Sequence, residues 1–82
     1  MDIEDKIRDF ILTELAYDRS DLELCSDTSL IEGGIVDSIG VLKLMIYLES
    51  EFSFKIAPKD YGPASFETIG AIRDLVNRYV RM

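Results

Sequence analysis

The sequence predicts an all-α domain, a small four-helix bundle with three long helices and one short one. In three separate segments, apolar residues recur at intervals of three and four, the period of amphipathic helices. Pro58 and Pro63 leave room for only one helical turn between the second and third of these segments. A chain of 82 residues allows one domain, expected to span residues 1–82, in which nearly every periodic apolar residue is needed for the core.

The first helix is expected over residues 2–16, with charged residues on the face opposite its apolar stripe. That stripe consists of Ile3, Ile7, Phe10, Ile11 and Leu15. From Tyr17 to Asp37 the apolar residues lose the helical period, and Ser, Asp and Gly residues supply turn chemistry. We therefore expect a long loop between the first two helices. The residues expected to fix it to the core are Leu22, Leu24, Leu30 and Ile31.

The second helix is expected over residues 38–51 and is apolar around more of its circumference than one buried face requires. Its core stripe consists of Val41, Leu44, Met45, Leu48 and Phe52. A second row, formed by Ile39, Leu42 and Ile46, lies about a third of a turn away. This surplus row needs an explanation other than the core.

A short helix or turn is expected around residues 59–61, and a last helix over residues 67–81. The apolar stripe of the last helix consists of Ile69, Ile72, Leu75, Val76, Tyr79 and Val80. Thr68 or Ser65 can cap its start. Arg73, Arg78 and Arg81 lie toward the end where the helix dipole favours positive charge.

Composition and charge exclude several classes of protein. With 48% hydrophobic and 30% charged residues the chain is globular, and no apolar run is long enough to span a bilayer. Its net charge of -7 repels nucleic acids and anionic membranes, so we expect protein partners with basic patches. The acidic N-terminus does not resemble a secretory signal, which favours a cytoplasmic location. The single cysteine, Cys25, is expected to be a half-buried apolar residue without a disulfide.

The sequence also argues against catalysis. It contains no histidine, which excludes Ser–His and Cys–His nucleophiles and histidine metal sites, so we expect no catalytic residue and no metal. The nucleophile elbow G-x-S-x-G is not matched around Ser38, because position 36 is Val. The chain is therefore expected not to be an enzyme.

The most informative feature is Ser38, which follows Asp37 at the start of the second helix. Free backbone N–H groups and the positive end of the helix dipole can hold a phosphate at such a position. The serine hydroxyl therefore looks like an attachment point. The alternative for the Asp37-Ser38 pair is ordinary N-capping.

Residues 29–40, SLIEGGIVDSIG, resemble the D-S-[LIM] modification site of acyl and peptidyl carrier proteins. Residues 48–52 resemble the end of that family's second helix, and residues 66–72 resemble its F-x-T-I motif before the last helix. The resemblance extends from about Ile3 to Val80 and implies an acyl-carrier-like fold. It further implies that a phosphopantetheinyl transferase esterifies Ser38, beside Asp37, with 4'-phosphopantetheine from coenzyme A. The arm's thiol would then hold an acyl or aminoacyl group as a thioester.

The resemblance also implies that the second helix is the docking surface for the transferase, for a loading enzyme (adenylating or acyltransferase) and for downstream modifying or condensing enzymes. The candidate docking residues are Ile39, Leu42, Lys43, Ile46 and Glu49, helped by Asp37. Some of the apolar row could instead cover the base of the arm or pack under the long loop. Fatty-acid carriers usually have an acid where Lys43 stands, so Lys43 indicates other partners or is only a solvated surface charge.

The expected protein is thus a discrete, monomeric carrier of a biosynthetic pathway. Nonribosomal peptide or polyketide synthesis is the expectation, and the sequence leaves a fatty-acid pathway open. Residues 41–47 and 52–61 look most like carriers of amino acids, including the prolyl and pyrrolyl carriers of natural-product synthesis. The alternative is an unmodified helical adaptor that binds a partner through the apolar face of the second helix.

Overall fold

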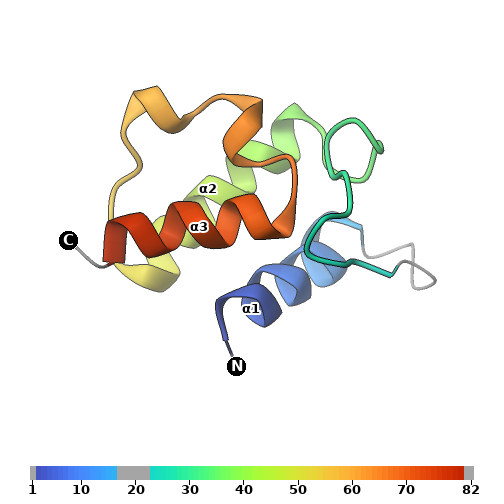
Figure 1. Ribbon diagram of the computed structural model, residues 1–82, viewed down its shortest axis with the longest axis horizontal. Coiled ribbons are helices and arrows are strands. Elements are labelled where there is room, and N and C mark those ends of the chain that lie inside the picture. Colours follow the sequence, from blue (N-terminus) through green and yellow to red (C-terminus); the bar gives the residue numbers. More distant parts are fainter. Residues whose placement is uncertain (1, 17–22, 81–82) are drawn as a thin grey trace.

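The computed structural model describes residues 2–16 and 23–80. In these residues the fold is all-helical, without strands, as predicted (Figure 1). The helical elements are α1 (Ile3–Phe10), the π-helical segment η1 (Ile11–Leu15), α2 (Ser38–Phe52), the 3-10 turns η2 (Pro58–Asp60) and η3 (Pro63–Ser65), and α3 (Ile69–Val80).

The predicted short fourth helix is not confirmed. Pro58 and Pro63 each begin a separate single turn, and the residue before each proline is extended, with ψ 148° at Ala57 and 161° at Gly62. A proline fixes its own φ and disfavours the helical region for its predecessor, so the two turns cannot merge into one helix. The described residues therefore contain three α-helices and two isolated turns.

Helix boundaries follow from their caps. The Asp2 carboxylate accepts a hydrogen bond from the Asp5 N–H at 2.9 Å and caps the start of α1. After Phe10 the helix continues as the wider π-helical segment η1, which begins at Ile11. Helix α3 begins two residues later than predicted, because the Thr68 hydroxyl accepts from the Ala71 N–H at 3.0 Å and caps it. Ser65 instead ends η3. The predicted end of the last helix at Arg81 lies outside the described residues.

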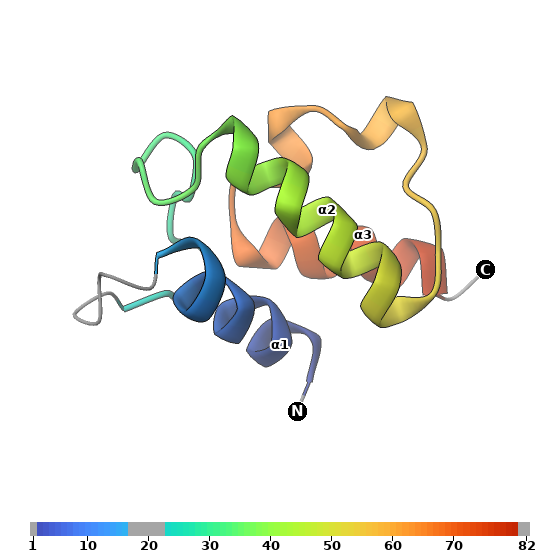
Figure 2. The same ribbon diagram turned by 180° about the vertical axis from the view of Figure 1, so that it is seen from behind.

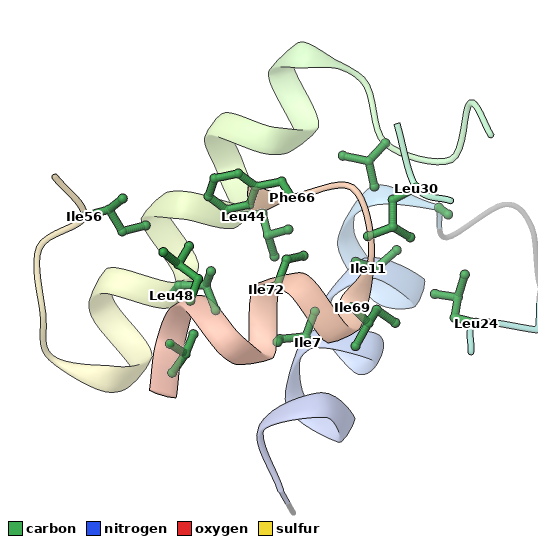
Figure 3. Packing of buried hydrophobic residues seen from close by; sticks show 14 residues of the cluster. Ile7, Ile11, Leu24, Leu30, Leu44, Leu48, Ile56, Phe66, Ile69 and Ile72 are labelled. Carbon is green, nitrogen blue, oxygen red and sulfur yellow. The ribbon is translucent and has the colours of Figure 1, made fainter. Parts of the chain in front are cut away.

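The core lies between α2 and α3, with α1 packed along one side (Figure 2). Leu44 and Leu48 from α2 are fully buried, as the predicted stripe requires, and Phe66 enters from the segment before α3 (Figure 3). The fully buried residues of α1, η1 and α3 are Ile7, Ile11, Ile69, Ile72, Leu75 and Val76. No helix in the described part of the chain is long and apolar enough to cross a membrane.

Residues 23–37 form the described part of the predicted long loop and lie beside the start of α2 (Figure 1). Leu24 and Leu30 are buried and Ile31 is half-buried, as predicted, whereas Leu22 lies outside the described residues. The expectation for Cys25 was wrong, because its side chain is exposed. Its backbone forms a surface turn, in which the Cys25 N–H donates to the Thr28 hydroxyl at 2.9 Å.

A polar network joins this loop to α1 and α3. The Glu4 carboxylate of α1 accepts hydrogen bonds from the Ser26 hydroxyl and from the Arg73 guanidinium of α3. These two contacts hold the pKa of the Glu4 carboxyl below its usual range. In addition, the Gly70 N–H, which has no partner within the first turn of α3, donates to the Ser26 carbonyl at 2.8 Å.

Candidate functional site

Ser38 is the first residue of α2, and its side chain is exposed. The preceding residue, Asp37, is the N-cap, with extended backbone angles (φ -97°, ψ -175°), and its carboxylate accepts from the Gly40 N–H at 2.7 Å. The two predicted residues therefore have different roles. Asp37 caps the helix, which leaves the Ser38 hydroxyl at the helix N-terminus with no part in capping.

Replacing Asp37 by alanine should therefore lower the free energy of unfolding by about 1 kcal/mol, because the Gly40 N–H loses its capping acceptor. Asp37→Asn keeps a capping oxygen, so its free energy of unfolding should fall much less. Urea unfolding followed by circular dichroism measures both variants. Equal stability of Asp37→Ala and the wild type would show that the cap does not stabilise α2.

The backbone turn before Asp37 brings the chain to the start of α2. The Leu30 carbonyl accepts from the N–H groups of both Ile35 and Val36 at 2.9 Å, and the buried Val36 side chain anchors the turn in the core. Gly34 has a φ of 75°, in the left-handed region that favours glycine. The glycines in the sequence motif thus form the turn that places Asp37 and Ser38.

A groove of about 450 Å³ lies beside Ser38, with one wall from α2 and the other from Tyr61 and from Pro63, the first residue of η3. Its lining residues are Ile31, Asp37, Ser38, Val41, Leu42, Met45, Tyr61 and Pro63. Tyr61 and Pro63 could not be expected here from the sequence, since no local pattern places them next to Ser38. An exposed hydroxyl next to an open groove, at the positive end of a helix, can accept a phosphodiester and leave room for a flexible chain.

The surplus apolar row is exposed on α2. Ile39, Leu42 and Ile46 are 65%, 54% and 59% exposed, so they neither pack under the described loop nor join the core. Lys43 lies on the same face, is exposed, and forms no ion pair with residues 2–16 or 23–80.

Glu49 is separate from this row. Its side chain is half-buried, and its carboxylate accepts a hydrogen bond from the Ile56 N–H at 2.9 Å. The structure therefore brings together Ser38, Asp37 and the exposed row on one side of α2, whereas the Glu49 side chain holds the segment that follows the helix.

Known proteins with sequences similar to this chain are carrier proteins. No protein-family model matches the chain. A D-alanyl carrier protein of Streptococcus uberis (strain ATCC BAA-854 / 0140J) is 31% identical over 72 residues, which cover 88% of this chain and 87% of that protein. A D-alanyl carrier protein of Streptococcus pyogenes serotype M5 is 31% identical over 52 residues, 63% of this chain and 66% of that protein. Since the first similarity spans most of both proteins, the chain belongs to the family of acyl and peptidyl carrier proteins, which bear a covalent 4'-phosphopantetheine group.

Proposed function

We propose that this protein carries an aminoacyl group as a thioester on a 4'-phosphopantetheine arm attached to Ser38, and delivers it to partner enzymes. The observation that supports this most directly is the exposed Ser38 hydroxyl at the start of α2, beside a cap made by a different residue. When attached, the arm supplies a thiol on a flexible tether.

The protein's own contribution is to present one hydroxyl. In the modification reaction the Ser38 oxygen attacks the phosphate of coenzyme A that bears the pantetheine. The P–O bond to the adenosine bisphosphate half breaks, and the hydroxyl proton leaves to the transferase. Asp37 keeps the first turn of α2 formed, so that its remaining N–H groups point toward the new phosphodiester. We propose no catalytic residue in the chain itself.

The cargo we propose first is D-alanyl, because the relatives described above are named D-alanyl carrier proteins. The prolyl and pyrrolyl cargoes and the natural-product pathway expected from the sequence find no support in those names. A loading assay distinguishes the D-alanyl cargo from the prolyl cargo. The arm-bearing protein is incubated with ATP and adenylating enzymes specific for D-alanine or for L-proline, and the thioester is detected by intact-mass spectrometry.

We also propose that partner enzymes dock on the exposed row of α2, Ile39, Leu42 and Ile46, with Lys43 between them. Three apolar side chains more than half exposed on one helix face are available to a partner surface. Glu49, expected as a docking residue from the sequence, already accepts a hydrogen bond from the Ile56 N–H. Its proposed role is therefore to support the helix end rather than to contact a partner.

The docking proposal predicts that Ile46→Glu lowers kcat/KM for phosphopantetheine transfer by about 10-fold, with little effect on stability. An exposed position tolerates the change within about 0.5 kcal/mol, whereas loss of one apolar anchor at an interface costs about 1 to 2 kcal/mol. Lys59→Gln, which makes the same change in net charge at an exposed position outside α2, is the matched control. If both variants react like the wild type, Ile46 is not a docking residue.

The proposal is tested by intact-mass spectrometry before and after incubation with coenzyme A and a broad-specificity phosphopantetheinyl transferase. One adduct located at Ser38 supports the carrier function. If the folded protein remains unmodified, the helical adaptor that binds through the apolar face of α2 becomes the better explanation. The further expectations of a single carrier domain over residues 1–82, a monomer, a cytoplasmic location and no nucleic-acid or membrane partner belong to the same proposal.

A further inference from the structure

Glu67, just before α3, holds the loop that leads to Ser38. Its backbone carbonyl accepts a hydrogen bond from the Leu30 N–H at 2.7 Å. Its half-buried carboxylate accepts from the Ser29 hydroxyl and, more weakly, from the Glu32 N–H at 3.4 Å. One residue thus contacts both the backbone and the side chains of the loop.

No other residue in the described part of the chain forms a hydrogen bond with residues 29–36 from outside that segment. The remaining hydrogen bonds of the segment are internal, from Gly34 to Ile31 and from Ile35 and Val36 to Leu30. Besides the apolar packing of Leu30, Ile31, Ile35 and Val36 in or against the core, Glu67 is therefore what holds this turn relative to the helices.

The turn is also part of the surface that any enzyme acting at Ser38 must meet. Glu32, Gly33 and Gly34 are exposed. Gly34 to Val36 continue directly into Asp37 and line a hollow of about 250 Å³, together with Ile39 and Lys43 of α2. A displaced turn would change the shape of the surface on one side of Ser38.

We propose that Glu67 is a positioning residue for the modification of Ser38. Its carboxylate holds residues 29–36 in the conformation that the phosphopantetheinyl transferase recognises. This inference rests on the proposed carrier function and adds a residue that lies 29 positions beyond Ser38 in the sequence.

A positioning role for Glu67 predicts a change in KM without a change in kcat, which a purely structural role does not. Without the carboxylate, the turn samples other conformations and only a fraction of the molecules is competent to bind the transferase. The KM for the carrier then rises by the reciprocal of that fraction, while kcat stays unchanged. Loss of the hydrogen bonds that the Glu67 carboxylate accepts corresponds to an increase of about 5- to 10-fold in KM, while the backbone bond from Leu30 remains.

The test uses Glu67→Ala, Glu67→Gln and Ser29→Ala. Initial rates of phosphopantetheine transfer are measured against carrier concentration, with saturating coenzyme A and a broad-specificity transferase. Glu67→Ala should show the increase in KM. Glu67→Gln keeps an oxygen that accepts from Ser29 and should stay within about 2-fold of the wild type. Ser29→Ala removes only the hydroxyl that donates to Glu67, so its KM should lie between those of the two Glu67 variants. If Glu67→Ala does not fold, Ser29→Ala serves as the test in its place.

The matched control is Glu51→Ala, which removes a carboxylate paired with Lys6 at 2.8 Å, at the far end of α2 from Ser38. Its KM should equal that of the wild type. A wild-type KM for Glu67→Ala, or an equal rise in Glu51→Ala, would overturn the inference while the carrier function stands. An unmodified wild type would overturn both.

Discussion

Ser38→Ala is expected to abolish attachment of phosphopantetheine completely, because it removes the one oxygen to which the arm can be joined at this site. The fold should be unaffected. Ser38 is exposed and the cap is provided by Asp37, so the free energy of unfolding should change by no more than about 0.5 kcal/mol. Intact-mass spectrometry after incubation with coenzyme A and the transferase gives the first result, and urea unfolding gives the second.

Ser50→Ala is the matched control, because Ser50 is another exposed serine of α2. It should be modified like the wild type. An adduct that persists on Ser38→Ala would place the attachment elsewhere. A large loss of stability in the same variant would mean that the hydroxyl serves the helix, contrary to the division of roles between Asp37 and Ser38.

Gly33→Ala is expected to destabilise the protein by about 1 to 3 kcal/mol. A Cβ at Gly33 would lie 2.2 Å from the backbone carbonyl oxygen of Ser29, so the backbone of the turn must shift. This shift disturbs the turn that leads to Ser38, and the variant should also be modified more slowly under conditions in which it remains folded. Chemical unfolding and the rate of phosphopantetheine transfer measure the two effects.

Gly62→Ala provides the comparison within the same chain. Gly62 has a φ of -68°, which alanine adopts readily, and a Cβ there would meet nothing within 4 Å. We expect it to be neutral or more stable by up to about 1 kcal/mol, because alanine restricts the unfolded chain. Similar losses in both variants would show that general backbone flexibility, rather than crowding at Ser29, explains the effect of Gly33→Ala.

The helices and the exposed row of α2 could be predicted because both depend on local periodicity. Leu44 and Leu48 fall on the buried face and Ile39 on the exposed one, which a spacing of three and four residues specifies without knowledge of the rest of the fold. The position of Ser38 at the start of α2 followed from the same pattern together with the preceding glycines.

The contacts of polar side chains could not be predicted, because they depend on segments far apart in the sequence. Glu49 is an acidic residue of the kind expected on a docking surface, but its carboxylate accepts a hydrogen bond from the Ile56 N–H. Glu67 gave no local signal, since its partners at Ser29 and Glu32 lie more than thirty residues earlier. The place of Tyr61 in the groove could not be predicted either, because it depends on the path that the chain takes after α2.

The backbone hydrogen bonds between residues 26–30 and residues 67–70 also affect the newly made protein. Ser26 and Leu30 find their backbone partners at Gly70 and Glu67, which the ribosome adds about thirty residues after Ser38. A nascent chain that ends before this point contains the serine but lacks the partners that hold the preceding turn relative to the helices. If the proposed transferase recognises this turn, we expect it to modify the chain only after folding and truncated chains to be poor substrates.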